Sequence, residues 1–421
     1  MQDREVKVAT DLGTGQITRA DKKSWTERND LPRRAQYRRQ MQASVQPWAV
    51  ATLKLILTPL FSRVFKTLDV DGFNELRELL AAGPVVLAPT HRSHFDYLLL
   101  TYFFDRQGLR LPYIIAGDNL NFFPAGFFLR RSGGLFIRRS FNNDRLYQEV
   151  FENYVSELLE QGKMLEVFIE GGRTRSGILR EPKLGFLKTL VGFLEQGKLA
   201  DLKIVPISIN YDRVIEETDL AREFLGQSKP KESIFELLES FFRLFKKESA
   251  CYIRFQQPLA VRDFILQSEL RANIERGYNG EVWHQVENLA QQIITQAEAV
   301  EVITTRNIFA AIWSFNNFSR MHVEELYRQG RSLADCLQGA GVEVRYAHHL
   351  ELLEAKIERY GHRLIDGYLP DPTELARTAE LYYLRALSSH FLRLENSKLE
   401  LEKLSSELAA VLCHIRNAAK L

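Results

Sequence analysis

The chain has 421 residues, of which 45% are hydrophobic and 26% are charged, so its composition is that of a globular protein and excludes a largely disordered chain. Its 56 basic and 54 acidic residues leave a net charge of +2, which excludes a global field that would drive nucleic-acid binding. This length predicts two or three packed units. The cysteines Cys251, Cys336 and Cys413 lie far apart without a CxxC pair, which predicts reduced thiols in a cytosolic protein.

Residues 1–70 are predicted to form a basic arm followed by an amphipathic helix. The first residues, MQDREVKVATDLG, contain acidic side chains and no apolar run typical of a secretory signal, so we expect the protein to stay on the cytoplasmic side. The apolar window from Pro47 to Phe61 contains Lys54 and is shorter than the roughly 20 residues that a spanning helix needs. We therefore expect no transmembrane helix in this segment.

The helical spacing of apolar residues from Trp48 to Leu68 leaves two roles open. The helix either docks onto the rest of the protein or lies in a membrane interface. In the second case a basic group would meet anionic headgroups while apolar side chains enter the interface. The basic group is Arg33, Arg34, Arg38 and Arg39, and the apolar side chains are Trp48, Leu53, Leu57 and Phe61.

Residues 71–262 are predicted to form an α/β domain with a mixed, largely parallel sheet flanked by helices. Short apolar runs typical of buried strands alternate with amphipathic stretches, notably the helical patterns at 147–161 and 183–196. Ligands of such sheets usually bind at the strand ends, where polar residues cluster here. The six predicted strands are 84–89, 111–117, 134–139, 164–170, 203–211 and 251–258.

Residues 263–421 are predicted to form a helical C-terminal domain. Near the C-terminus an apolar stripe at helical spacing favours packing inside the chain over a coiled coil, because fewer than about four clean heptads are present. The stripe consists of Leu401, Leu404, Leu408, Leu412 and Ile415. The predicted fold is therefore an α/β domain between helical N-terminal and C-terminal regions.

The stretch THRSHFDYLLL places His91 and Asp96 at a strand-to-helix turn, with a helix expected to begin near Ser93. Ser93 and Asp96 resemble a capping box, so Asp96 would only satisfy free amides at the helix start. Alternatively, the chain folds back and the Asp96 carboxylate holds one imidazole nitrogen of His91. The other nitrogen would then serve as a base for a substrate hydroxyl. Spacing alone leaves both interpretations open.

His94 offers a competing interpretation, because HRSHFD also resembles a His-x-x-His-x-Asp metal cluster of a metallohydrolase. However, no further histidine occurs before His284, and no HExxH or CxxC pattern supports a metal site. We therefore expect no catalytic metal.

Arginines follow two of the predicted strands, each beside a glycine pair. Guanidinium groups fit phosphate oxygens with two parallel hydrogen bonds, and glycines let the backbone approach a ligand closely. We expect the two strands to be neighbours, so the arginines at their ends predict an anionic substrate. A third strand, VPISINYDRV, is predicted to be buried and supports the site. The candidate residues are Arg138, Arg139, Glu170, Gly171, Gly172, Arg173 and Arg175, with Pro206 and Tyr211 in the third strand.

In this order, THRSHFDYLLL, GGLFIRRS, FIEGGRTRSG and VPISINYDRV resemble the four sequence blocks of the glycerolipid acyltransferases, including their His-x4-Asp signature. The residues of these blocks are most similar to those of the bacterial membrane glycerol-3-phosphate acyltransferase and its animal mitochondrial and dihydroxyacetone phosphate relatives. The resemblance is strong from about residue 84 to 214 and weak to about 342. The third block reads RTRSG where RSRTG is commoner. The chain is also much shorter than the full-length bacterial enzyme.

The resemblance implies transfer of a fatty acyl group from acyl-CoA or acyl carrier protein to the sn-1 hydroxyl of glycerol 3-phosphate, giving lysophosphatidate. The same chemistry on dihydroxyacetone phosphate or lysophosphatidate stays open, and a lipid hydrolase is the more distant alternative. His91, held by Asp96, would be the base, and backbone amides near Ser93 are candidates for stabilising the oxyanion. Glu170 would order the arginines or touch the acceptor. The four arginines Arg138, Arg139, Arg173 and Arg175 would bind the phosphate.

The lipid product implies a place for the protein at a membrane. We expect no cofactor beyond the thioester co-substrate, no nucleic-acid partner, and peripheral attachment to the cytoplasmic face of the cell membrane through residues 33–68. Phenylalanines in NFFPAGFFLRR would line an acyl groove, dip into the bilayer or pack in the core. They are Phe122, Phe123, Phe127 and Phe128.

Overall fold

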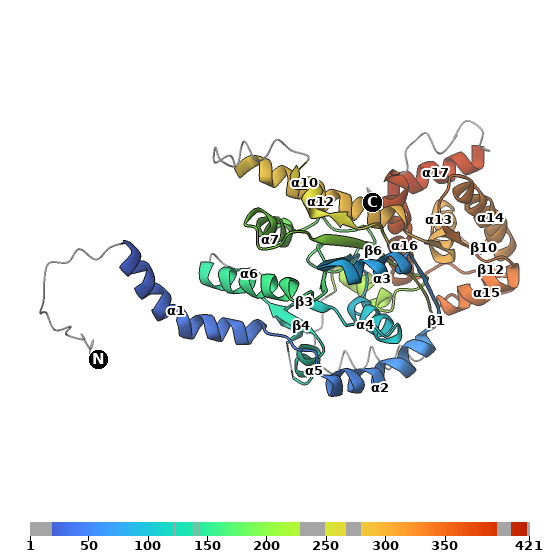
Figure 1. Ribbon diagram of the computed structural model, residues 1–421. Coiled ribbons are helices and arrows are strands. Elements are labelled where there is room, and N and C mark those ends of the chain that lie inside the picture. Colours follow the sequence, from blue (N-terminus) through green and yellow to red (C-terminus); the bar gives the residue numbers. More distant parts are fainter. Residues whose placement is uncertain are drawn as a thin grey trace, which may run out of the picture.

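The computed structural model describes residues 19–121, 123–138, 140–141, 144–227, 249–266, 279–393 and 406–418, and its centre is a mixed β-sheet covered by helices (Figure 1). The strands run in the order β1-β7-β6-β2-β5-β3-β4, and the short β8 lies beside β6. β6 is antiparallel to β7 and β8, while the other pairs in this sheet are parallel. This confirms the predicted mixed, largely parallel sheet. The strands are β1 Phe65–Asp71, β2 Val85–Pro89, β3 Tyr113–Gly117, β4 Gly134–Ile137, β5 Leu165–Val167, β6 Lys203–Tyr211, β7 Ser249–Phe255 and β8 Leu259–Ala260.

The six predicted strands are confirmed as β2 to β7, but β1 was missed. The helix expected to run to Leu68 ends at Val64, and the next residue, Phe65, begins a strand that pairs in parallel with β7. Val64 and Phe65 fit the helical spacing, so the local pattern hides the change. Strand formation here depends on a partner far along the chain, which the pattern of one segment does not reveal. β1 also spans the predicted domain limit at residue 70.

Helices cover both faces of the sheet, with α2, α3 and α4 on one face and α6, α7 and α12 on the other (Figure 1). In β2, Val85 and Leu87 belong to one hydrophobic cluster, and Val86 and Ala88 belong to the other. Alternate side chains of a strand point to opposite faces, so a strand buried on both faces is a continuous apolar run.

The helical predictions at 147–161 and 183–196 are confirmed as α6 and α7. The helices are α1 Arg19–Met41, α2 Pro47–Val64, α3 Phe73–Ala82, α4 Asp96–Arg106, α5 Ala125–Arg131, α6 Arg145–Glu160, α7 Leu184–Glu195, α8 Glu217–Phe224, α10 Val261–Leu266, α12 Asn279–Ala299, α13 Thr305–Phe315, α14 Val323–Gly339, α15 Leu350–Arg359, α16 Glu374–Arg393 and α17 Ser406–Ala418. A 3-10 turn lies at Asp118–Leu120. Two small sheets pair β9 Ile303–Thr304 with β11 Val344–Arg345, and β10 Met321–His322 with β12 Tyr368–Leu369.

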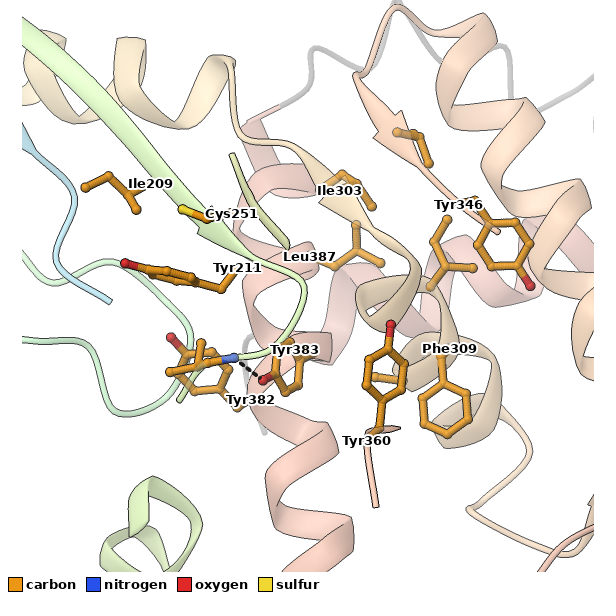
Figure 2. Close-up of a cluster of buried hydrophobic side chains, with 14 of the residues drawn as sticks. Ile209, Tyr211, Cys251, Ile303, Phe309, Tyr346, Tyr360, Tyr382, Tyr383 and Leu387 are labelled. Carbon is orange, nitrogen blue, oxygen red and sulfur yellow. Dashed lines mark hydrogen bonds between the residues drawn. The ribbon is translucent and has the colours of Figure 1, made fainter. Parts of the chain in front are cut away.

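The C-terminal part is helical, as predicted, and shares a hydrophobic core with the sheet. Figure 2 shows Ile209 and Cys251 of the sheet on one side of this core, with Phe309 of α13 and Leu387 of α16 on the other. These helices therefore bury their apolar faces against the α/β domain, and the predicted domain limits stay predictions. In the predicted C-terminal stripe, Leu412 and Ile415 are buried. Leu401, Leu404 and the side chain of Leu408 lie outside the described residues.

Helix α2 has an inner and an outer apolar face. Leu57 and Phe61, which we expected at a membrane interface, are instead buried in the protein core, and Leu53 packs against the same cluster. They point inward because they share one face of the helix, which packs on α4 and β1. The outer face carries Trp48 and Leu55, with 47% and 77% of their surface exposed. Docking therefore accounts for the inner face of the helix but not for its outer face.

The basic arm is partly neutralised by α6. Arg34 forms an ion pair with Glu149 at 2.6 Å, and Arg38 donates two hydrogen bonds of 2.8 and 2.5 Å to Glu157. These two arginines were expected at lipid headgroups, and the structure gives them partners inside the protein. In the part of the chain that the structure covers, no helix is long and apolar enough to cross a membrane.

Candidate active site

The central strand β2 delivers the histidine motif to the end of the sheet. The Thr90 amide donates to the Ile207 carbonyl at 2.9 Å, and the Thr90 hydroxyl accepts from the Ile209 amide at 3.0 Å, so β6 fixes the point where the turn begins. Helix α4 begins at Asp96 rather than near Ser93. The difference arises because residues 93–95 form a tight turn, closed by the Asp96 amide on the Ser93 carbonyl at 3.2 Å.

The fully buried Asp96 carboxylate accepts four hydrogen bonds at this turn. Its Oδ2 lies 2.9 Å from Nδ1 of His91 and also accepts the backbone amides of Arg92 and Ser93, at 2.7 and 2.9 Å. Its Oδ1 accepts the Tyr211 hydroxyl at 2.6 Å. Both interpretations of Asp96 therefore hold at once, because one carboxylate satisfies the turn amides and holds the imidazole. The sequence indicated Tyr211 only as a strand residue, not as a partner of Asp96.

The hydrogen bonds of His91 set its tautomer. An ionised carboxylate can only accept, so Nδ1 carries the proton and Nε2 is left with a lone pair. The ring also lies against Phe168, with ring centroids 4.1 Å apart, and 14% of the side chain is exposed. His91 is thus held on one edge and one face while the rest of its ring can reach a ligand.

Glu170 joins the histidine turn to the glycine loop. It is fully buried, and its two oxygens accept the backbone amides of His91 at 2.8 Å and Arg180 at 2.9 Å. The Thr174 amide returns a hydrogen bond to the His91 carbonyl at 2.9 Å. Burial raises the pKa of Glu170, and these backbone bonds oppose the rise. Glu170 was expected to order the arginines or touch the acceptor, whereas its hydrogen bonds go to the backbone of the two loops.

The glycine pair is needed by the loop itself. Gly171 has a φ of 65°, and a Cβ there would lie 2.8 Å from the Lys183 side chain. A Cβ on Gly172 would lie 2.6 Å from Nη1 of Arg180. The expected tight turn is present, and the space that the glycines leave is filled by these two basic side chains.

Arg173 and Arg175 face the same carboxylate on α8. Nη2 of Arg173 lies 4.0 Å from Glu223, and Nε of Arg175 lies 3.1 Å from it. Arg173 is largely buried, and its Nη1 has no hydrogen-bond partner. Arg175 is 62% exposed. The pair therefore offers unused donor capacity beside the histidine turn, to which the loop is bonded.

Arg138 lies elsewhere, which corrects the expectation that both arginine groups end neighbouring strands. Arg138 directly follows β4, which is the edge strand, and β3 separates β4 from β5. The Arg138 guanidinium lies 4.2 Å from the Tyr147 ring centroid and 3.4 Å from Asp144. Strand order depends on crossover connections that local patterns do not reveal. Arg139 lies outside the described residues.

The backbone amides near Ser93 are already occupied. Besides the two amides on Asp96, the His94 amide donates to Glu216 at 2.8 Å, and the Phe95 amide donates to the Ser93 hydroxyl at 3.1 Å. That hydroxyl itself donates to Glu216 at 2.8 Å. As the turn stands, these amides stabilise its own acceptors and not an oxyanion.

The remaining candidates have structural positions. Pro206 is buried in β6 opposite Ala88 of β2, so it lies in the wall behind the turn.

Within the described residues, no group of three or more histidine, cysteine, aspartate and glutamate side chains is arranged to hold a metal ion.

An apolar cleft begins one residue from Asp96, at Tyr97 of α4. It has a volume of about 30 Å³ and continues into a second hollow of about 20 Å³ between α2 and α4. The two hollows share Leu53, Thr101 and Ser132. Ile114, Ala116 and Phe136 of β3 and β4 form the floor of the larger one.

Two protein-family models match this chain. Residues 69–210 match the family model described as Acyltransferase, and residues 220–388 match the model described as Glycerol-3-phosphate acyltransferase C-terminal region. The second match extends well beyond the limit near residue 342 that the sequence resemblance suggested.

Several curated proteins named glycerol-3-phosphate acyltransferase are similar to this chain. Those of Actinobacillus pleuropneumoniae serotype 5b, Haemophilus ducreyi and Pseudoalteromonas translucida are 35%, 33% and 36% identical over 282, 290 and 279 residues. These alignments cover 65%, 67% and 65% of this chain and 34%, 35% and 34% of the relatives, so the chain spans about a third of their length.

Among solved structures, the 1-acyl-sn-glycerophosphate acyltransferase of Thermotoga maritima is 17% identical, with a TM-score of 0.35 over 58% of this chain and 79% of that chain. These values are too low to support a conclusion. The two family models carry the assignment: residues 69–210 form a domain of the acyltransferase family, and residues 220–388 match the C-terminal region of the glycerol-3-phosphate acyltransferases.

Proposed function

We propose that this chain transfers a fatty acyl group from acyl-CoA or acyl carrier protein to the sn-1 hydroxyl of glycerol 3-phosphate, giving lysophosphatidate. The names of its relatives and the two family models support this reaction. The observation that carries it is the hydrogen bond of 2.9 Å between Nδ1 of His91 and the buried Asp96. It leaves Nε2 of His91 as a base in the loop region where Arg173 has an unpaired guanidinium nitrogen.

His91 acts as the general base and then as the general acid. Nε2 takes the proton of the acceptor's primary hydroxyl while that oxygen attacks the thioester carbonyl. The tetrahedral intermediate then expels the thiolate, which takes the proton back from Nε2. An ester and a free thiol result, and no acyl-enzyme forms. The Asp96 carboxylate stabilises the imidazolium between the two steps, and a positioned base of this kind contributes roughly 10²- to 10⁴-fold.

The acceptor's phosphate binds to Arg173 and Arg175. A phosphate could pair with Nη1 of Arg173, which lacks a hydrogen-bond partner, and with the exposed fork of Arg175. Glu223 holds both side chains and keeps them in place until the acceptor arrives. Arg138 is left out of this proposal because its guanidinium lies on tyrosine rings at the edge of the sheet.

The fatty chain of the donor lies along the apolar surface that starts at Tyr97. Each methylene that leaves water there contributes about 0.8 kcal/mol. The reaction needs no metal ion, since the imidazole activates the hydroxyl and a thiolate is a good leaving group.

We further propose peripheral attachment to the cytoplasmic face of the cell membrane. Helix α2 exposes the apolar residues Trp48, Leu55 and Ile56, and the ring of Trp48 lies beside Phe127 of α5, with ring centroids 5.9 Å apart. Phe123, at 80% exposure, precedes α5. This patch, rather than the inner face of α2, would enter the interface. The same two helices line or adjoin the apolar cleft, so a lipid product has a short path to the bilayer.

The test offers the purified chain a radiolabelled acyl-CoA with each of three acceptors: glycerol 3-phosphate, dihydroxyacetone phosphate and lysophosphatidate. We expect labelled lysophosphatidate from the first acceptor, in excess chelator as well as without it. Product from another acceptor alone would replace the proposed substrate. Release of free fatty acid without transfer would make the protein a hydrolase.

A further inference from the structure

Arg92, the residue after the catalytic histidine, is bound to the C-terminal region. It is buried, and its Nη2 donates to Glu301 at 2.5 Å, across 209 positions of the sequence. Its Nη1 donates to the Gly177 carbonyl at 3.1 Å. Glu301 is itself buried and lies just after α12. An ion pair inside the protein thus joins the catalytic turn to a segment outside the acyltransferase match at residues 69–210.

Glu301 also holds the strand behind the turn. The same oxygen accepts the side-chain amide of Asn210 at 2.9 Å, and Asn210 in turn accepts the Val302 amide at 3.2 Å. Asn210 precedes Tyr211 in β6. The Glu301 carboxylate therefore fixes both Arg92 and Asn210. Arg92 donates its backbone amide to Asp96, and Asn210 precedes Tyr211, which donates its hydroxyl to Asp96.

These contacts converge on the catalytic carboxylate. The Arg92 amide reaches Oδ2 of Asp96 at 2.7 Å, and the Tyr211 hydroxyl reaches Oδ1 at 2.6 Å. A shift of Arg92 or of the end of β6 would move a donor away from Asp96. It would then loosen the Asp96 carboxylate that holds Nδ1 of His91.

The C-terminal region also presses on the other side of the turn. Gly177 has a φ of 92°, and a Cβ there would clash with the Tyr382 carbonyl oxygen of α16. The Gly177 carbonyl accepts from Arg92, so α16 limits how far this loop can retreat. Burial acts to lower the pKa of Arg92, but the charge of Glu301, together with smaller contributions from Tyr382 and Glu170, outweighs it and the pKa is raised. Without Glu301 the buried guanidinium would lack its counter-charge, a costly state that favours movement of the turn.

We infer that Glu301 is a positioning residue for acyl transfer, supplied by the C-terminal region, which sets the His91–Asp96 geometry through Arg92 and Asn210. The inference rests on the proposed function for its kinetic consequence, but its structural consequence can be measured in the free protein. It gives the C-terminal region a role in the chemistry beyond covering the sheet.

The test variant is Glu301→Gln, which keeps the shape and removes the charge. We expect kcat to fall roughly 10- to 100-fold, which is the loss expected when a reacting group is misplaced by about an ångström. The KM for glycerol 3-phosphate should stay within about threefold of the wild-type value. Glu301→Asp keeps the charge and should recover part of the loss. A fall in kcat that Asp does not relieve, or a rise in KM alone, would overturn the inference.

The matched control is Glu380→Gln. Glu380 is also fully buried and pairs with a buried arginine, Arg306, at 2.6 Å, but its hydrogen-bond partners Arg306 and His362 both lie in the C-terminal region. Both variants should lower the thermal midpoint, and only Glu301→Gln should lower kcat disproportionately. Equal kinetic losses would mean that any buried ion pair matters equally, against a positioning role.

A second readout does not need turnover. In protein labelled with ¹⁵N-histidine, the Nδ1–H proton of His91 bonded to a carboxylate should give a downfield resonance, assigned by its loss in His91→Gln. It should broaden or move upfield in Glu301→Gln and persist in Glu380→Gln. If wild type shows the resonance but no acyl transfer, the proposed function fails and the positioning role stands. An unchanged resonance in Glu301→Gln contradicts the positioning role whatever the activity.

Where Glu301→Gln folds too poorly, Arg92→Gln and Asn210→Ala replace it. Each removes one of the two side chains through which Glu301 acts, so each should lower kcat while the KM for glycerol 3-phosphate stays within about threefold. An unchanged kcat in both variants would overturn the inference.

Discussion

The Tyr211 hydroxyl donates a hydrogen bond of 2.6 Å to Oδ1 of Asp96, joining the end of β6 to the first residue of α4 across 115 positions. Tyr211 is completely buried, and desolvation followed by the nearby Asp96 charge raises its pKa well above the usual value. The hydroxyl therefore keeps its proton across the accessible pH range and remains a donor. Asp96 is thereby satisfied at both oxygens.

Replacing Tyr211 with phenylalanine should cost stability and activity together. Hydrogen bonds to charged groups contribute roughly 1.5–3 kcal/mol, so Tyr211→Phe should lower the free energy of unfolding by about that amount. Urea denaturation measures it. The kcat should fall as well, because Asp96 gains freedom. Tyr252→Phe, on the neighbouring strand β7, is the control; a Tyr211→Phe variant as stable and active as this control would contradict the role of the hydroxyl.

The buried Glu166 of β5 should make stability depend on pH. Both of its oxygens lack hydrogen-bond partners, and desolvation, followed by the Asp96 charge, raises its pKa well above 4.5. As the pH rises above about 4.5, the unfolded chain releases this proton while the folded protein keeps it, so stability falls until the folded pKa is reached. Glu166→Gln removes this titration.

We therefore expect the stability advantage of Glu166→Gln over wild type to grow between pH 5 and pH 8, by at most about 1.4 kcal/mol per pH unit. Urea unfolding at four pH values in this window provides the measurement. An advantage that is constant, or that shrinks with rising pH, would show that Glu166 is ionised in the folded protein.

Removing the charge of Arg173 should weaken acceptor binding specifically. Arg173→Gln should raise the KM for glycerol 3-phosphate by at least tenfold, with little change for acyl-CoA, because a largely buried guanidinium loses its phosphate partner. Arg175→Gln should have a smaller effect, since 62% of that side chain is exposed. Arg138→Gln is the control at the sheet edge and should leave both KM values unchanged. An equal rise for both substrates in Arg173→Gln would point to a purely structural role.

A charge in the exposed patch of α2 should reduce membrane attachment. Leu55 is 77% exposed, so Leu55→Glu should leave the fold intact and reduce sedimentation with anionic and neutral liposomes alike. Leu352→Glu, on α15 at 40% exposure, is the matched control. High salt should weaken binding to anionic liposomes only. If Leu55→Glu sediments like Leu352→Glu, the patch is not the anchor.

Local patterns could predict the strands and helices of the fold but not which strands lie side by side. The runs that became β2 to β7 are apolar because both faces of the sheet are covered, a property that each segment carries in its own residues. β1 was not predicted because its conformation depends on its pairing with β7. The order of the strands also decides that Arg138 lies apart from Arg173, and no local signal records that order.

The same limit applies to the candidate site. His91 and Asp96 could be paired from the sequence because they are five residues apart and flank a turn. Glu301 carries no motif, and its contact with Arg92 exists only because the C-terminal region folds onto the sheet. Tyr211 could be placed at a strand end, but its hydroxyl partner follows from the pairing of β2 with β6.

The central claim is that His91, and not His94, is the base. The most direct measurement compares kcat for His91→Ala and His94→Ala, with binding of glycerol 3-phosphate followed by calorimetry and folding followed by thermal denaturation. We predict that His91→Ala loses transfer by at least about 10²-fold while it still binds the acceptor, because the imidazole held by Asp96 supplies the proton transfer. His94→Ala should keep substantial activity. Turnover that survives His91→Ala but disappears in a folded His94→Ala would contradict the account.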